Sequence, residues 1–107
     1  MLQLPDSLII SRTDNLGDVI LTLPLAGYLK SIKPTIKIFF IGKAYTKPVI
    51  EASKMVDEFL DREELLQNPE KLAATKAEAI IFVFPDKEIA KIAYSHIKLR
   101  VDRKSVV

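Results

Sequence analysis

Short apolar runs alternate with polar, turn-rich segments along the whole chain. Three runs, residues 8–10, 36–41 and 79–84, are rich in β-branched and aromatic side chains. Such runs are typical of strands that are buried on both faces of a parallel sheet. Two weaker runs, residues 56–60 and 99–101, predict a short edge strand and a fifth strand.

The segment after the first run predicts a helix. Leu25, Leu29 and Ile32 have the i, i+4, i+7 spacing of one helix face. We expect Pro24 to lie near the start of this helix, where it distorts the first turn or introduces a kink. The helix should end at Lys33, because a residue that precedes proline avoids the helical conformation.

Three further helix starts are marked by a capping residue or a proline. Thr46 with Pro48 predicts a short helix, and Asn68 before Pro69 predicts another. The dipeptide at residues 85–86 begins the last helix. The apolar face of that helix comprises Ile89, Ile92, Ala93 and Ile97.

The alternation of strands with helices predicts an α/β fold. We expect a Rossmann-like, doubly wound parallel sheet of about five strands in the order 3-2-1-4-5, within a single domain over residues 1–107. Ligands of such sheets bind beyond the carboxyl ends of the strands where the strand order switches, here between strands 1 and 4. The loops at that point are residues 11–18 and 84–86.

Residues 103–107 supply no helix to cover the fifth strand. A buried parallel strand at an open edge promotes aggregation, and complete domains usually cover it. We therefore expect the natural domain to continue beyond this chain, or another chain to cover this edge.

Composition narrows the classes of function. The chain is 49% hydrophobic and 28% charged, which is typical of a globular domain and not of a disordered one. It has no cysteine and a single histidine, His96, which excludes disulfides, thiolate metal sites and multi-histidine metal sites. We see neither a signal peptide nor an apolar run near the roughly 20 residues of a membrane helix, and we expect a cytoplasmic protein.

The net charge of +2 is too small to predict nucleic-acid binding. Its distribution is uneven, because basic residues exceed acidic ones by three in residues 1–50 and in residues 86–107, whereas residues 51–85 have an excess of four acids. If both basic segments reach the same sheet edge, that edge attracts phosphate or anionic lipid. The alternative is a solvated surface on which both signs are mixed.

The loop after the first strand contains the most promising chemistry. Gly17 permits close approach of a ligand and unusual backbone angles, and the amide groups of the following helix start form an anion site. Asp18 is then the helix cap or a first-turn acid, and an acid at this position also stabilises a helix without any further role. The loop lacks the glycine spacing of dinucleotide-binding sites and of P-loops.

The stretch of residues 8–25 combines an apolar strand, a polar turn, Leu16-Gly17-Asp18, a short apolar segment and Thr22-x-Pro24. This pattern resembles the N-terminus of glycosyltransferase family 9, the ADP-heptose:lipopolysaccharide heptosyltransferases. Weaker similarity continues through residues 37–45, 48–60 and 79–101. The resemblance covers nearly all of this chain but only the front of the family, whose members are much longer.

The resemblance implies an incomplete N-terminal domain of a GT-B fold, in which two Rossmann-like domains enclose the active site. In the family, the N-terminal domain holds the lipopolysaccharide core acceptor, and the C-terminal domain, absent here, holds most of the ADP-heptose. The reaction transfers a heptose with inversion at the anomeric carbon and needs no metal or other cofactor. Asp18 has the position of the proposed general base, and we expect this chain alone to be inactive.

The resemblance also suggests which residues contact the acceptor, namely Arg12, Asn15, Gly17 and Lys43. Arg12 and Lys43 follow strands 1 and 2, so they are placed to meet phosphate groups or Kdo carboxylates. Arginine suits a bidentate contact and lysine acts as a point charge. A role in surface solubility is the alternative for both.

Other expectations concern packing and location. We expect His96 at the surface or packed at a helix end, and Tyr28 and Tyr45 in packing positions instead of the site. The expected partners are the core acceptor and, mainly through the missing domain, ADP-heptose. The basic excess also permits peripheral contact with the inner face of a bacterial inner membrane.

Two other classes of function remain open. One is a stand-alone flavodoxin-like binding or regulatory module, although a phosphoacceptor domain needs an acidic cluster where this chain has Ser11-Arg12-Thr13. The other is an interaction module that self-associates through the uncovered fifth strand.

Overall fold

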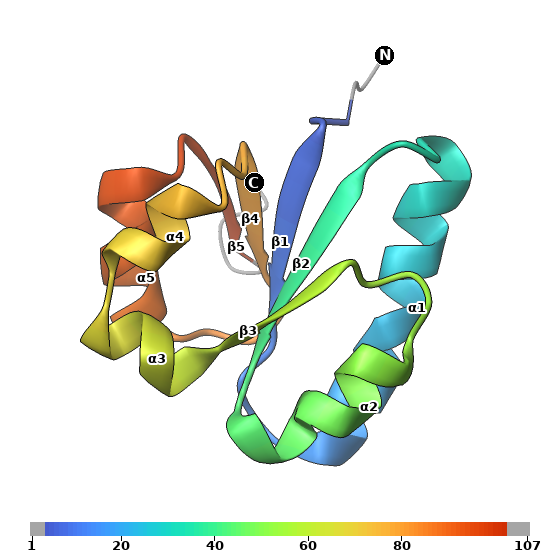
Figure 1. The fold of residues 1–107 in the computed structure, drawn as a ribbon, viewed down its shortest axis with the longest axis horizontal. Coiled ribbons are helices and arrows are strands. Elements are labelled where there is room, and N and C mark those ends of the chain that lie inside the picture. The colour runs from blue at the N-terminus through green and yellow to red at the C-terminus, as the bar shows by residue number, and fades with distance from the viewer. Residues whose placement is uncertain (1–3, 103–107) are drawn as a thin grey trace.

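The computed structural model describes residues 4–102 of the chain. Its centre is a five-stranded parallel sheet with helices on both faces, and the strand order is β3-β2-β1-β4-β5 (Figure 1). The predicted α/β class, number of strands and strand order are therefore confirmed. The strands are β1 (Ser7–Ser11), β2 (Lys37–Gly42), β3 (Glu58–Asp61), β4 (Ala79–Phe82) and β5 (Leu99–Asp102).

The helices form two layers around the sheet. In Figure 1, α1 and α2 lie on one side of the sheet and α3, α4 and α5 on the other. This arrangement is the three-layer architecture of a doubly wound domain. The helical elements are α1 (Leu16–Ile32), η1 (Ala44–Thr46), α2 (Lys47–Ala52), α3 (Arg62–Gln67), α4 (Glu70–Ala74) and α5 (Lys87–His96).

Strand β1 is the middle of the sheet and is buried on both faces. Ile9 and Ile10 are fully buried, and Ile10 lies opposite Phe40 of β2 and Ile81 of β4. Because successive side chains of a strand point to opposite faces, neighbouring residues of β1 enter different core clusters. This explains why the strand sequence is an unbroken apolar run and not an alternating one.

The two core clusters tie each helix layer to the sheet. On one face, buried side chains of α1 and α2 pack against the strands: Val19, Ala26, Leu29 and Ile50 with Leu8, Ile10, Ile38, Phe40 and Ala79. On the other face, α3, α4 and α5 contribute Leu65, Leu72, Ile89 and Ala93, which pack against Ile9, Phe39, Ile41, Ile80 and Phe82.

Two expectations about helices were wrong. Pro24 lies inside α1, more than two turns from its start, and the helix continues through it. The side of the helix at Pro24 faces solvent, so water can satisfy the carbonyl that proline leaves unpaired. Helix α3, with Leu65 as its buried residue, was not predicted, because one apolar anchor in six residues gives no periodic signal.

The two predicted caps have different outcomes. Thr46 lies at the N-cap of α2 as expected, with Pro48 in the first turn, but its buried hydroxyl donates to the Lys43 carbonyl and makes no capping bond. Helix α4 has Pro69 and not Asn68 at its N-cap, with no side-chain capping bond. The fourth strand ends at Phe82, two residues earlier than its apolar run, because the chain bends there into the loop before α5.

One part of the sheet has little cover among the described residues. Leu99 and Val101 of β5 pair with Ala79 and Ile81, which face the α1 side. Leu99 and Val101 are 54% and 37% exposed. The outer strand β5 thus presents apolar side chains on the face where no helix of residues 4–102 packs over it.

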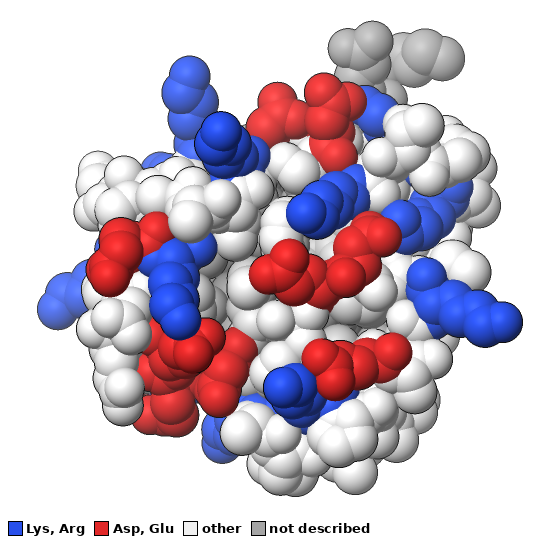
Figure 2. Space-filling view, in the orientation of Figure 1, with Lys and Arg blue, Asp and Glu red and all other residues white. Residues whose placement is uncertain are grey.

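The surface charges are mixed on the face in view. Figure 2 shows lysines and arginines interspersed with acids, and the densest group of acids lies over the region of α3. The excess of basic residues at both ends of the sequence therefore produces no basic face in this view.

Candidate active site

The loop from β1 to α1 lies at the carboxyl edge of the sheet. Asn15 is the N-cap of α1, and its side-chain oxygen accepts a hydrogen bond of 2.9 Å from the Asp18 amide. Asp18 is therefore the first-turn acid and not the cap. An acid in the first turn is favoured by the helix dipole, so this local sequence suits a helix start.

Gly17 belongs to the first turn of α1. None of the glycines among the described residues has a positive φ, so the expected unusual backbone angles at Gly17 are wrong. A Cβ atom at Gly17 would meet only the Asn15 side-chain oxygen, at 3.5 Å. The residue is exposed, so the open space beside it remains compatible with close approach of a ligand.

Arg12 contacts both aspartates of this loop. Its Nε and Nη2 atoms donate to the two carboxylate oxygens of Asp14 at 3.0 and 3.1 Å, and Nη2 lies 3.4 Å from Oδ1 of Asp18. The guanidinium also lies 5.9 Å from the centre of the Phe84 ring. Arg12 thus lies at this edge of the sheet, as expected. Its Nε and Nη2 donors are already paired with the Asp14 carboxylate.

A second network joins the loops after β1, β3 and β4. The Thr13 hydroxyl donates to Asp86 at 2.6 Å, and Arg62 donates to the same carboxylate from Nε at 2.8 Å and Nη2 at 3.3 Å. The Asp86 side chain, only 4% exposed, also caps α5 by accepting from the Ile89 amide. This buried carboxylate therefore has partners from three positions of the fold.

The ionisation of this network follows from its contacts. Burial alone raises the pKa of Asp86, but hydrogen bonds from Arg62, Thr13 and the Ile89 amide outweigh it and lower the pKa below 3.8. Hydrogen bonding to Asp86 first, and then to Glu88 and Glu63, raises the pKa of Arg62 above its usual value. Arg62 is therefore a fixed cation whose charge is neutralised by carboxylates of its own chain.

Lys43 lies where the second network meets solvent. It lines an open cavity of about 340 Å³, together with Thr13, Arg62, Phe84, Pro85, Asp86, Lys87 and Glu88. Lys43 and Lys87 come from the two basic segments of the sequence and meet at this cavity. Neither lysine forms an ion pair among the residues that the structure describes.

The structure brings the expected site residues to one edge of the sheet. Arg12, Asn15, Gly17 and Asp18 share the loop that begins α1. The sequence reasoning gave no role to Thr13, Asp14, Arg62 or Asp86. Thr13, Asp14 and Asp86 lie in the two loops predicted at the switch point, whereas Arg62 had no signal in the sequence.

The three residues expected to have packing roles have different outcomes. His96 ends α5 and is exposed, so its expected surface position is confirmed. Tyr28 and Tyr45 are 63% and 58% exposed, so their expected packing role is wrong. The Tyr45 hydroxyl instead donates to the Asp14 carbonyl at 3.3 Å, which places it beside the loop of the candidate site.

Residues 4–102 contain neither a metal-binding cluster nor a membrane-spanning helix. No group of three or more histidine, aspartate or glutamate side chains there is arranged to hold a metal ion. None of the helices in this part of the chain is long and apolar enough to cross a membrane.

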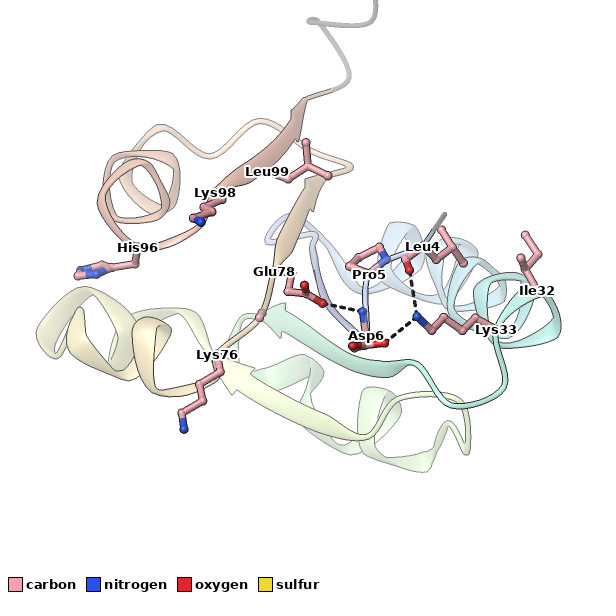
Figure 3. Close-up of a pocket in the computed structure, with 11 residues that line it drawn as sticks. Leu4, Pro5, Asp6, Ile32, Lys33, Lys76, Glu78, His96, Lys98 and Leu99 are labelled. Carbon is pink, nitrogen blue, oxygen red and sulfur yellow. Dashed lines mark hydrogen bonds and ion pairs between the residues drawn. The ribbon is translucent and has the colours of Figure 1, made fainter. Parts of the chain in front are cut away.

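A larger cavity, of about 1020 Å³, lies at the opposite edge of the sheet (Figure 3). Its polar groups hold the start of the chain in place: Lys33 donates to the Leu4 carbonyl and to Asp6, and Glu78 accepts from the Asp6 amide. Because ligands of doubly wound sheets bind at the carboxyl ends of the strands, size alone does not make this cavity the functional site.

Comparison with known proteins extends these observations. No protein-family model matches the chain, and no curated protein matches its sequence. Among solved structures, a family 9 glycosyl transferase from Veillonella parvula superposes with a TM-score of 0.73 and 21% identity over 89% of this chain. E. coli ADP-heptose lps heptosyltransferase II gives 0.76 and 18% over 92%, and the E. coli heptosyltransferase WaaC, solved with ADP, gives 0.69 and 17% over 90%.

The similarity concerns the fold and a part of each neighbour. The chain covers 30%, 30% and 34% of the three solved chains. The match spans nearly all of β1 to β5, so the resemblance first indicated by the loop at Gly17 and Asp18 is confirmed at the level of the fold. The chain has the Rossmann-like fold of about one third of a family 9 glycosyltransferase.

Proposed function

We propose that this chain is the acceptor-binding part of a heptosyltransferase that transfers heptose from ADP-heptose to the inner core of lipopolysaccharide. The observation that carries the proposal is the position of Asp18. This carboxylate is 37% exposed, in the first turn of α1, at the carboxyl edge of a sheet that matches heptosyltransferases in fold. Lys43 and Lys87 at the neighbouring cavity supply positive charge for an anionic acceptor.

In the proposed reaction, Asp18 is the general base. Its carboxylate takes the proton of an acceptor hydroxyl while the hydroxyl oxygen attacks the anomeric carbon of the heptose. The bond from that carbon to the diphosphate oxygen breaks, and ADP leaves with the bonding electrons. Attack from the side opposite the leaving group inverts the anomeric configuration.

The division of labour between domains is also part of the proposal. The three solved neighbours are about three times as long as the matched segment. We place most ADP-heptose contacts in the part of a full-length enzyme that lies outside the matched segment. The chain alone should therefore bind acceptor, bind ADP-heptose weakly or not at all, and catalyse no transfer. Incubation of the chain alone with both substrates should yield no glycosylated acceptor.

Acceptor binding is the direct test on this chain. Backbone amide signals of ¹⁵N-labelled protein are followed by NMR during titration with a core oligosaccharide that contains Kdo, and separately with ADP-heptose. The oligosaccharide should shift the signals of Gly17, Asp18 and Lys43. Shifts caused by ADP-heptose and not by the oligosaccharide would reverse the assignment of this domain to the acceptor.

A pair of lysine variants sharpens this test. Lys43→Ala removes a charge from the candidate site, whereas Lys98→Ala removes one from the cavity at the opposite edge of the sheet. We expect weaker oligosaccharide binding only in the first variant. Equal loss in both would indicate attraction by overall charge instead of a site.

The exposed side chains of β5 favour a second candidate, self-association. Leu99 and Val101 form an apolar surface beside an open strand edge, and two copies of the chain can bury it against each other. Light scattering during size exclusion should then show dimers that Leu99→Lys converts to monomers. A monomer at high protein concentration would count against this candidate.

The location in the cell belongs to the same proposal. An acceptor that is part of a lipid brings its enzyme to the membrane surface, so we propose a cytoplasmic protein that works at the inner face of the bacterial inner membrane. Sedimentation with vesicles that contain lipopolysaccharide core, compared with vesicles that lack it, tests whether the acceptor recruits the chain.

A further inference from the structure

Arg12 divides its contacts unequally between two carboxylates. It makes a two-pronged interaction with Asp14, in which both contacts are 3.0–3.1 Å. Its contact with Asp18 is a single ion-pair contact of 3.4 Å, which is longer than a usual N–H···O hydrogen bond. One guanidinium thus bridges the two acids but belongs mainly to Asp14.

Burial reinforces this difference. The Arg12 and Asp14 side chains are 14% and 13% exposed, whereas Asp18 is 37% exposed. A bidentate pair of an arginine and a carboxylate that is shielded from water is strong and geometrically fixed. Asp18 therefore keeps most of its oxygen lone pairs open to solvent or to a ligand.

The arrangement would change if Asp14 lost its carboxylate. The Nε and Nη2 edge of Arg12 would be free, and Asp18 is the next carboxylate already within 3.4 Å. An arginine fork that is released from one carboxylate turns to a neighbouring one, because unpaired charge of low exposure is unfavourable. Asp18 would then accept two donors from Arg12 and have fewer lone pairs left for another hydrogen.

We propose that Asp14 is a positioning residue that holds the donor edge of Arg12 away from Asp18 and so leaves Asp18 free to accept a hydrogen bond from the acceptor hydroxyl. This inference rests on the proposed role of Asp18 as the base. Asp14 acts through Arg12 and touches neither the acceptor nor the reacting atoms. Its backbone carbonyl, which accepts from Tyr45, helps to hold it in the loop.

The test follows the Nε–H signal of Arg12 by NMR in the 107-residue chain. Protection of this proton from exchange with water reports whether Nε is hydrogen bonded. In the unmodified protein the proton should be protected, and Asp18→Asn should leave it protected because Asp14 is its partner. In Asp14→Ala the proton should stay protected with Asp18 as the new partner, and only Asp14→Ala combined with Asp18→Ala, which leaves no side-chain acceptor at either position, should lose protection.

Three outcomes would overturn the proposal. These are loss of protection in Asp18→Asn alone, loss in Asp14→Ala alone, and persistence of protection in the double variant. Asp14→Glu should restore the original pattern, in which Asp18→Asn has no effect. If Asp14→Ala does not fold, Asp14→Leu, which has similar side-chain bulk and no acceptor, is judged by the same outcomes.

A matched control removes a carboxylate from the other arginine network. Glu88 pairs with Arg62 at 2.7 Å and belongs to the other network, so Glu88→Gln should leave the Arg12 signal unchanged. A change there would show that the signal reports general loosening of the domain and would overturn the assignment to Asp14. None of these measurements involves turnover, so they are independent of whether the chain proves to bind an acceptor.

Discussion

The Thr13 hydroxyl lies 2.6 Å from the Asp86 carboxylate, across 73 positions of sequence. This bond joins the loop after the central strand to the cap of the last helix. Arg62, at the start of α3, adds two further donors to the same carboxylate. The carboxyl edge of the sheet is therefore cross-linked by polar contacts, in a region where doubly wound domains otherwise rely on separate loops.

Removal of Arg62 should destabilise the fold through Asp86. Arg62→Ala leaves a nearly buried carboxylate with fewer donors, and we expect a loss of about 3 kcal/mol in the free energy of unfolding. Urea denaturation of Arg62→Ala and of the unmodified protein measures this loss.

The control for this prediction uses the exposed partner of the same arginine. The Glu88 side chain is 68% exposed, so Glu88→Gln should change stability by less than about 1 kcal/mol. Equal losses for the two variants would contradict a dominant role of the buried pair.

Stability should decrease in acid. The pKa of Asp86 is lowered in the folded state, despite burial that raises it, by hydrogen bonds from Arg62, Thr13 and Ile89. A carboxyl with a lowered folded pKa stabilises the protein above its unfolded pKa, and this contribution disappears as the pH falls through the folded pKa. Urea midpoints measured from pH about 7 to below about 3 should therefore drop at the acid end. In Asp86→Asn the urea midpoint should decrease less in acid. If the decrease is as large as in the unmodified protein, other carboxyl groups cause it.

Removal of two buried hydroxyls near the end of β1 should change stability in opposite directions. Ser11 is fully buried, and its Oγ has no hydrogen-bond partner among the described residues, whereas the Thr13 hydroxyl is bonded to Asp86. Ser11→Ala removes an unsatisfied group and should raise stability by about 1 kcal/mol, while Thr13→Val should lower it by about 1 kcal/mol. Thermal unfolding of both variants provides the comparison, and a destabilised Ser11→Ala would show that this hydroxyl is satisfied in solution.

Two glycines differ in the space around them. A Cβ at Gly42 would lie 2.8 Å from the Thr46 hydroxyl and 2.9 Å from the Ile50 side chain, so Gly42→Ala should lose about 1–3 kcal/mol by overpacking. Gly17→Ala meets nothing closer than 3.5 Å and replaces a helical glycine, so its stability should rise by up to about 1 kcal/mol. Chemical denaturation compares the two.

Gly17→Ala also separates folding from binding. If an acceptor approaches the backbone at Gly17, the added methyl group should weaken binding of the core oligosaccharide although the domain is as stable as before. Undiminished binding would remove Gly17 from the proposed contact surface.

The sequence predicted the sheet better than it predicted the helices. The apolar runs that became β1, β2 and β4 are buried on both faces, which leaves an unambiguous pattern. Pro24 was misjudged because an exposed proline is tolerated inside a long helix whose other face is held by the core. The short helix α3 depends on tertiary packing of Leu65, which local patterns do not reveal.

The candidate site was predicted in part. The loop at Gly17 and Asp18 has a local signature, so its place at the start of α1 followed from the sequence. The two arginine pairs did not follow from the sequence. The pair of Arg12 with Asp14 depends on side-chain direction, and the pair of Arg62 with Asp86 joins loops far apart in the chain. Arg12 was expected to meet an anionic group of the acceptor; its donors are paired with Asp14 in the structure, and a contact with the acceptor stays a prediction.

The cap of α5 has a consequence for what this edge of the sheet can select. In many doubly wound proteins, the helix that begins at the switch point receives the phosphate of a nucleotide. Here Asp86 already plays the part of that anion, supplied by the chain itself and held by Arg62 and Thr13. The Ile89 amide at this helix start is already paired with a carboxylate of the chain itself, so an incoming phosphate would find this donor occupied, whereas a hydroxyl near Asp18 would meet no such competitor.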